Sequence, residues 1–167
     1  FNEAESATLD LSASDVDEDE LIFSITGGTN ITAILDSSIV TFGVIDSDWN
    51  GTESFTATVD DGELSDSKSF SVTVLPINDS PILTFVDDQI VNEGESLIIL
   101  LSAFDIDGDN LQFEAISTDN INTEITGTAL TISPVGDFYG TDFITINVLD
   151  GYGGIDTQDI TVIVEPV

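Results

Sequence analysis

Residues 76–81 read Pro-Ile-Asn-Asp-Ser-Pro, and this stretch divides the sequence into two similar halves. Before it, Ser69–Leu75 alternates between polar and apolar side chains, which is the pattern of a β-strand. Two prolines placed so closely can neither extend that strand nor begin a helix. Because a new set of strand-like segments follows Pro81, we predict a stiff linker at residues 76–81 between domains at residues 1–77 and 78–167.

The two halves are copies of each other. Asn2–Phe23 aligns without gaps on Asn92–Phe113 at an offset of 90 residues, and 12 of these 22 positions are identical. The match resumes after one gap and runs to the end, where Pro76 aligns with Pro166. Self-similarity at a fixed spacing is the signature of a chain built from successive units of one fold.

Short alternating segments separated by Asp, Asn and Gly turns predict an all-β fold. The expected strands of the first copy lie within Ala7–Ala13, Leu21–Ile25, Ile31–Leu35, Ile39–Phe42, Phe55–Val59 and Phe70–Val74. Those of the second copy lie within Ile98–Ala103, Leu111–Ala115, Ala129–Ile132, Phe143–Leu149 and Ile160–Val164. We predict two tandem Greek-key β-sandwiches of the cadherin or Ig type, with about seven strands each and no helix beyond a turn.

The charge balance excludes several classes of function. The chain has 33 acidic residues and one cation, Lys68, for a net charge of −32. Nucleic acids and anionic membrane surfaces require clustered Lys and Arg, so neither is an expected partner. The absence of Cys and His removes thiolate and imidazole metal sites and the commonest general base. A hydrophobic content of 41% predicts a folded chain, whose surface carboxylates serve either divalent cation sites or adaptation to salty water.

No apolar run approaches the length of a membrane span, so direct membrane insertion is not expected. The chain also contains no Met, and we expect it to be a piece of a longer protein.

Three acidic motifs recur at matching positions of the two copies: Glu-x-Glu near the start, Asp-x-Asp-x-Asp after a strand, and an Asp-Gly turn before the last strand. A single Asp in a turn is best explained by its own backbone hydrogen bonds and by solvation. Asp105 and Asp107 point the same way at a strand end, and together with the linker they favour a cation site. Calcium takes six to eight oxygens, so several runs must converge to form it.

Taken together, Glu-x-Glu, Asp-x-Asp, Ala-Thr-Val-Asp-Asp-Gly and the terminal Pro-Ile-Asn-Asp-Ser-Pro resemble bacterial cadherin-like or Ig-like tandem repeats of about 95 residues. Such repeats occur in large secreted or surface proteins of the adhesin type. The resemblance implies a Ca²⁺ site where successive repeats meet. Its ligands would be Glu3, Glu5, Asp46, Asp48, Asn78, Asp79, Asp105, Asp107 and Asp150. Half-sites completed by neighbouring repeats would be Asp15, Asp17 and Asp61 at one end and Glu93, Glu95 and Asp137 at the other.

The resemblance therefore predicts a calcium-binding, non-enzymatic module of a secreted or cell-surface bacterial protein, which Ca²⁺ stiffens for adhesion or as a stalk. Its expected partners are calcium ions, neighbouring repeats and a cell-surface protein or polysaccharide. The alternative is a polysaccharide- or protein-binding β-sandwich without a calcium-dependent joint. That alternative needs an exposed aromatic platform, whereas Trp49 and Tyr139, which lie 90 residues apart, are expected to be core or turn-packing residues. Neither a nucleophile elbow nor a phosphate-binding loop occurs.

Overall fold

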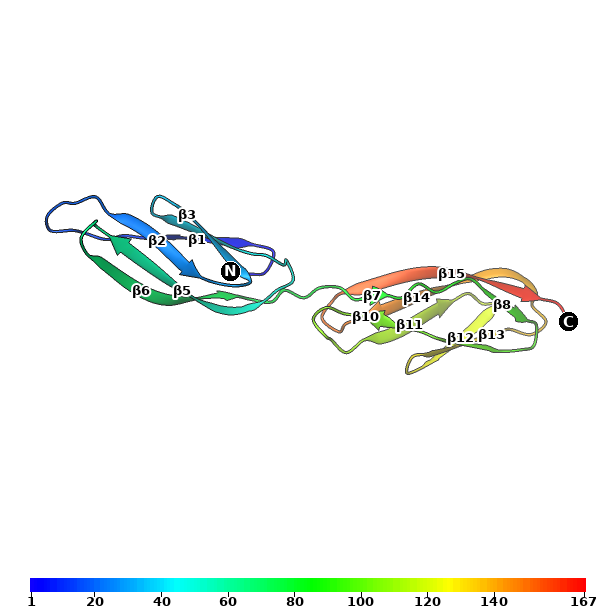
Figure 1. Ribbon diagram of the computed structural model, residues 1–167. Helices are drawn as coiled ribbons and strands as arrows, with labels where there is room; N and C mark the ends of the chain where they lie inside the picture. Colours follow the sequence, from blue (N-terminus) through cyan, green and yellow to red (C-terminus); the bar gives the residue numbers. More distant parts are fainter. The chain divides into compact units, whose positions relative to one another are not determined.

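The computed structural model describes all residues 1–167 and contains only strands, turns and loops (Figure 1). It divides into two compact units, Phe1–Ile77 (unit 1) and Asn78–Val167 (unit 2). Each unit stacks strands in two layers, so the predicted all-β tandem sandwiches are confirmed. No helix long and apolar enough to cross a membrane is present.

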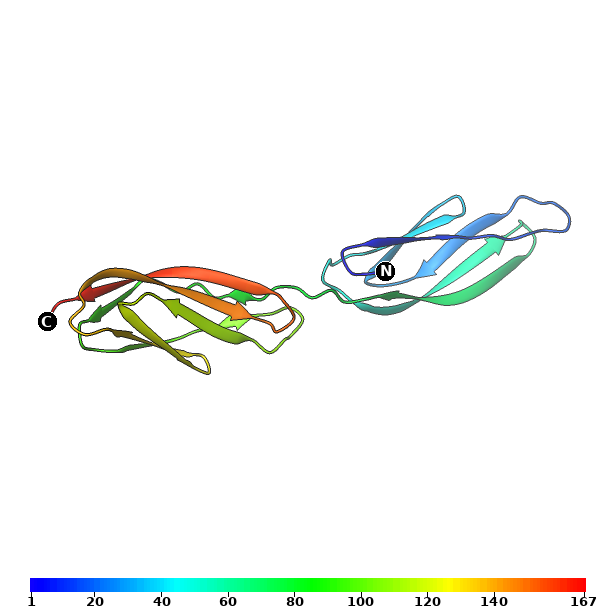
Figure 2. The same cartoon turned by 180° about the vertical axis from the view of Figure 1, so that it is seen from behind.

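Unit 1 has six strands in two three-stranded antiparallel sheets, which Figure 2 shows from behind. One sheet has the order β1-β4-β3, formed by Ser6–Asp10, Ile39–Val44 and Ile31–Asp36. The other has the order β2-β5-β6, formed by Ile22–Gly27, Gly51–Asp60 and Ser65–Val74. Since successive side chains of a strand point to opposite faces, the alternating residues give each sheet one apolar face.

The core of unit 1 is built around three phenylalanines. The ring of Phe42 meets that of Phe55 edge-on at a centroid distance of 5.2 Å, and Phe70 lies 6.1 Å from each of them. Such edge-to-face pairs add to the stability gained from burial alone. Gly28 lies against this cluster with φ of +75°, and a Cβ there would be 2.6 Å from the ring of Phe55. The turn before β3 therefore requires glycine.

Unit 2 has nine strands, two of them only two residues long. The first sheet has the order β11-β14-β15-β8, formed by Gln112–Ser117, Gly140–Leu149, Ile155–Glu165 and Gln89–Asn92. The second has the order β12-β13-β9, formed by Ile121–Thr126, Ala129–Pro134 and Leu97–Leu100. A short pair joins β10, Ala103–Phe104, to β7, Ile82–Leu83. All of these pairings are antiparallel except β8 with β15, which is parallel.

The core of unit 2 is aliphatic and more completely buried than that of unit 1. Ile144, Ile146 and Val148 alternate along β14 and are fully buried against Val162 of β15 and Ile132 of β13. Each fully buried aliphatic side chain of this size contributes roughly 1.5–3 kcal/mol of hydrophobic free energy. This core fixes the strand ends from which the acidic loops of unit 2 emerge.

The prediction was incomplete at the edges. β1 stops at Asp10 rather than continuing to Ala13, since the chain turns away after the Leu11 N–H donates to the Ser38 carbonyl. Three strands of unit 2, namely β7, β8 and β12, were not predicted, and the single strand predicted within Ile98–Ala103 is divided into β9 and β10.

Candidate calcium site

The loop after β10 gathers three carboxylates. Asp105 Oδ1 accepts hydrogen bonds from the backbone N–H groups of Asp107, at 3.0 Å, and Asp109, at 3.3 Å. Gly108, with φ of +78°, allows the tight turn. As a result, one carboxylate oxygen from each of Asp105, Asp107 and Asp109 lies within 4.8 Å of the others. We call these three residues the acidic triad.

The second oxygen of Asp105 is buried without a partner. The Asp105 side chain is 6% exposed, and its Oδ2 has no hydrogen-bond partner within the chain. Leaving a buried acceptor unsatisfied costs about 1–3 kcal/mol, and more for a charged group. A hard cation bound by the acidic triad would satisfy this oxygen, and the donor set consists only of oxygens, as Ca²⁺ prefers.

Like charges crowd this end of unit 2. Partial burial, followed by the negative charges of Asp105, Asp107 and Asp150, raises the pKa of Asp109 above its ordinary value. The acidic triad therefore strains the folded state, and a bound cation would relieve that repulsion.

The predicted linker residues Asn78 and Asp79 are bonded to the same loops. Asn78 Nδ2 donates to Asp150 Oδ2 at 2.8 Å, and the Asp79 N–H donates to Asp107 Oδ2 at 2.8 Å. The structure thus brings five predicted ligands of unit 2, these four and Asp105, into one connected network that also includes Asp109.

Asp150 differs from the triad because the chain already satisfies its carboxylate. Its Oδ1 accepts the N–H groups of Tyr152, Gly153 and Gly154 at 2.6, 3.0 and 3.0 Å. The hydrogen bond from Asn78, together with these backbone donors, lowers the pKa of Asp150. Asp150 is therefore charged and fixed in place, and it anchors Asn78 beside the acidic triad.

The two early glutamates play equivalent roles in their own units. Glu3 Oε1 accepts a hydrogen bond from the N–H of Ile77, and Glu93 Oε1 accepts one from the N–H of Val167 at 3.0 Å. Each glutamate therefore links the beginning of its repeat to the end of the same repeat. Glu3 is 3% exposed, and its Oε2, like Asp105 Oδ2, is buried without a hydrogen-bond partner. The second glutamate of each motif is exposed and bonds locally, Glu5 to the N–H of Asn2 and Glu95 to the side chain of Asn92.

The other predicted ligands lie in turns, where their side chains are either exposed or half-buried. Asp46 and Asp48 share a turn after β4, in which the Asp48 N–H donates to Asp46 Oδ1 at 3.2 Å, and they form no acidic group close enough to share an ion. Asp137, which matches Asp48, is exposed.

The matching turns of unit 1 repeat those of unit 2 only in part. Asp15 Oδ1 accepts the N–H groups of Asp17 and Asp19, as Asp105 does from its own loop. Asp61 accepts the N–H groups of Leu64 and Glu63, which lowers its pKa. Asp15, however, is only half-buried, so this turn lacks the enclosed carboxylate of the acidic triad.

Sequence reasoning did not name Asp109 as a ligand, although the third Asp of the recurring motif was a sufficient signal. It also gave no role to Glu53 and Asp142, which match at an offset of 89. The Glu53 carboxylate accepts hydrogen bonds from the backbone N–H groups of Thr29, Asn30 and Ile31. The Asp142 carboxylate accepts hydrogen bonds from the side chains of Thr118 and Asn120. Both carboxylates hold a loop in place and are structural.

The prediction for the aromatic residues was right for Trp49 and wrong for Tyr139. Trp49 packs against the core, and a Cβ at Gly51 would be 2.8 Å from its ring. The strand register aligns Gly51 with Gly140, so the residue matching Trp49 is Phe138, which packs on the core of unit 2. Tyr139 is 65% exposed.

Both units thus have the strand arrangement of an Ig-type sandwich, with acidic loops at the strand ends. The family model described as Bacterial Ig domain matches residues 1–74 and 78–163, and the chain belongs to this family as two tandem copies. It is a modular β-sandwich pair of the Ig and cadherin type.

One curated relative is Chitinase A of Pseudoalteromonas piscicida, which is 30% identical over 158 residues. The match covers 89% of this chain but only 18% of the chitinase, so the chain spans less than a fifth of that relative. Among solved structures, human Protocadherin-24 EC1-2 matches with a TM-score of 0.62 and 16% identity, covering 97% of this chain and 89% of that one. The Protocadherin GammaB4 extracellular domain matches with a TM-score of 0.52 and 20% identity, covering 87% and 27%. At these identities the two structures show the fold alone.

Proposed function

We propose that the chain is a calcium-binding module of an extracellular or cell-surface bacterial protein. The observation that supports this most strongly is that Asp105, a member of the acidic triad, has a buried Oδ2 without a hydrogen-bond partner. Ca²⁺ is favoured over Mg²⁺ because its larger and more flexible coordination shell suits clustered carboxylates, whereas Mg²⁺ demands near-ideal octahedral geometry.

In this proposal Asp105, Asp107 and Asp109 supply the first oxygens in unit 2, and the Asn78 and Asp79 segment is fixed next to them by hydrogen bonds. Further oxygens come, as the sequence predicts, from the preceding repeat: Glu3, Glu5, Asp46 and Asp48. A shared ion would cross-link successive repeats, so that Ca²⁺ makes the array stiffer and its removal leaves mutually repelling carboxylates. Such a stalk would serve adhesion or the display of other domains.

Calorimetric titration of the chain with CaCl₂, with MgCl₂ titrated in parallel at fixed high NaCl, tests the proposal. Extracellular modules bind Ca²⁺ with dissociation constants of about 10⁻⁴ to 10⁻³ M. We expect saturable heat with Ca²⁺ in that range, and a higher melting temperature in Ca²⁺ than in Mg²⁺. Equal effects of both ions, or of NaCl alone, would leave general charge screening as the explanation and would reject the calcium site.

A carbohydrate-binding module is the second candidate, and the relative named Chitinase A is the observation that favours it. Tyr139 and Tyr152 of unit 2 are 65% and 75% exposed, and their rings are available for stacking against a sugar. Binding to insoluble chitin that is lost in a Tyr139→Ala, Tyr152→Ala double variant would support this function. Equal binding by the variant and the parent chain would reject it.

A further inference from the structure

The outer face of the four-stranded sheet of unit 2 carries four apolar side chains that the core does not bury. They come from four different strands and are each 39–60% exposed: Ile116 of β11, Phe143 of β14, Ile163 of β15 and Ile90 of β8. Because successive side chains of a strand alternate between its two faces, all four lie opposite the face that packs on the core. We call these four residues the apolar band.

The strand register makes the apolar band continuous. Ile116 pairs with the residue two positions after Phe143 on β14, and Ile163 pairs with the residue two positions before it. Diagonal neighbours of this kind lie about 7–8 Å apart, which is within reach of an aromatic side chain. Ile163 in turn pairs directly with Ile90. The apolar band therefore crosses the whole sheet diagonally, with Phe143 in its middle.

Unit 1 shows that the fold does not require the apolar band. The register of the two units matches Ile116, Phe143 and Ile163 with three exposed hydroxyl residues of unit 1, namely Thr26, Ser54 and Thr73. The hydroxyl of Thr73 shares a hydrogen bond of 2.9 Å with that of Thr52 on the same face. The same face is thus polar in one repeat and apolar in the other. A contiguous apolar patch on such a surface marks a site of interaction.

The charged side chains beside the apolar band are acidic. Exposed carboxylates lie two residues along the chain from Ile116, Ile163 and Ile90, and these are Glu114, Glu165 and Asp88. A fourth carboxylate, that of Asp159, accepts a hydrogen bond of 2.6 Å from Thr145, which lies two residues from Phe143 on the same face.

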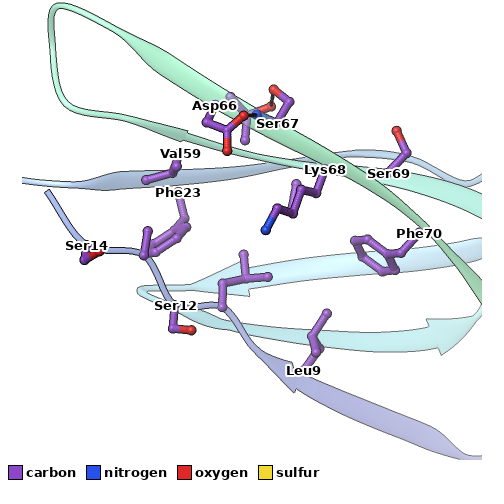
Figure 3. A pocket seen from close by; sticks show the side chains of 14 residues that line it. Leu9, Ser12, Ser14, Phe23, Val59, Asp66, Ser67, Lys68, Ser69 and Phe70 are labelled. Atoms are coloured by element: carbon purple, nitrogen blue, oxygen red, sulfur yellow. Dashed lines mark hydrogen bonds between the residues drawn. The ribbon is translucent and has the colours of Figure 1, made fainter.

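No cation of unit 2 neutralises these carboxylates. Lys68 is the only Lys or Arg of the chain, and it lies in unit 1. Figure 3 shows its side chain directed between Phe23 and Phe70 in a groove of that unit. The acidic border of the apolar band therefore remains uncompensated within unit 2.

This charge pattern decides which occupant fits the apolar band. A second copy of unit 2 would bring carboxylates against carboxylates, and like charges brought together at an interface reject a partner. An anionic lipid surface is repelled in the same way. A protein segment whose apolar side chains are bordered by Lys or Arg would instead cover the apolar band and pair with the carboxylates around it.

We propose that the apolar band of unit 2 docks a cationic amphipathic segment of another protein. Phe143 is the principal anchor, because aromatic side chains at the centre of an interface carry most of its binding energy. An amphipathic helix with basic residues along both sides of its apolar stripe has the required form. Four apolar residues make a smaller centre than that of a standard interface, in which roughly 20–30 residues of each partner take part, so the contact is transient.

The test titrates the full chain, in CaCl₂, with a synthetic helical peptide of about four turns that consists of a Leu stripe bordered by Lys. Amide NMR spectra follow the binding. We expect saturable shifts that are largest at Thr141, Thr145 and Thr161, which lie between members of the apolar band. Added NaCl should weaken the binding, because it screens the exposed carboxylates.

The matched variant gives the apolar band the residues of unit 1. Ile116→Thr, Phe143→Ser and Ile163→Thr together leave the net charge unchanged, and the same fold already holds these residues in unit 1. The variant should bind the peptide roughly tenfold more weakly or less. Trp49 is the only tryptophan and lies in unit 1, so its fluorescence follows the unfolding of that unit and should give the same transition in variant and parent. Dispersed amide signals from unit 2 show that the variant is folded.

A second variant tests the acidic border alone. Glu114→Gln with Glu165→Gln keeps the apolar band, and it should weaken binding and make the remaining binding less sensitive to NaCl.

Three results would overturn the proposal. Equal binding by the parent and by the triple variant would mean that net charge alone attracts the peptide, and an absence of shifts at the apolar band would exclude docking there. A dimer of the parent chain that the triple variant loses would make a second copy the occupant. Binding to neutral phosphatidylcholine vesicles that depends on Phe143 would make it a lipid surface.

Discussion

Replacing Asp105 with Asn separates the role of Asp105 in its turn from its role as a ligand. An asparagine side chain keeps an Oδ1 that accepts the N–H groups of Asp107 and Asp109. It removes the buried carboxylate oxygen that has no partner and one negative charge of the acidic triad. Without Ca²⁺, unit 2 of Asp105→Asn should therefore melt no lower than the parent chain. With Ca²⁺, it should lose the stabilisation that ion binding provides.

The expected size follows from linkage. At a Ca²⁺ concentration ten times the dissociation constant, binding to the folded state adds about 1.4 kcal/mol to the free energy of unfolding. For a unit of this length, 1 kcal/mol shifts the melting temperature by about 4–8 °C. The parent chain should therefore gain roughly 6–11 °C in Ca²⁺, and Asp105→Asn should gain almost nothing.

The assay is thermal unfolding followed by tyrosine signal, because both tyrosines, Tyr139 and Tyr152, lie in unit 2. Asp15→Asn is the matched control, since Asp15 makes the same two backbone hydrogen bonds in unit 1. It should leave the tyrosine-detected shift intact. A full Ca²⁺ shift in Asp105→Asn would refute the assignment of the acidic triad as the site.

Three further changes test how the units are built. Gly154→Ala would place a Cβ 2.8 Å from the Ser80 Cα and even closer to the Asp150 side chain. It should therefore lower the free energy of unfolding of unit 2, measured in urea, by about 1–3 kcal/mol. Gly43→Ala is the control and should cost far less, because its Cβ would meet only the Thr32 side chain, at 3.5 Å. Phe55→Ala should remove about 3–5 kcal/mol from unit 1, which is comparable to its whole stability, and should abolish the Trp49 transition while the tyrosine transition persists. The hydrogen bond from Thr118, then that from Asn120, lowers the pKa of Asp142, so its stabilising contribution is present above the unfolded pKa and is lost as pH falls through the folded value. Melting of unit 2 below pH ~4 should show this loss, and Asp142→Asn should make the curve flatter there; an unchanged curve would contradict the assignment.

The fold could be predicted because apolar alternation repeats twice along the chain, but the strands at the sheet edges lack that signal. β12 was missed because its inward-facing positions are Ile121, Thr123 and Ile125, and the polar Thr123 interrupts the apolar alternation. β7 is only two residues long and follows a proline, so it depends on its partner β10 rather than on its own sequence.

The candidate site was predictable only in part, since Asp105 and Asp107 were named and Asp109 was not, and its geometry was not predictable. The spacing of Asp105 and Asp107 indicated that their side chains converge. It could not indicate that Asp105 is buried while Asp107 is exposed, because packing across the unit decides burial. Nor could the sequence show that backbone N–H groups of the loop after Asp150 satisfy its carboxylate. The ligand roles themselves stay predictions until an ion is measured.

The parallel pairing of β8 with β15 bears on how unit 2 responds to tension. β8 lies near the start of the unit and β15 at its end, and parallel strands pulled from those two ends slide past each other lengthwise. The force is then shared by all the hydrogen bonds between Gln89–Asn92 and Val162–Glu165, which are loaded in shear, rather than breaking one bond after another. Under a pulling force applied at its two ends, unit 2 would therefore resist extension until these hydrogen bonds break together.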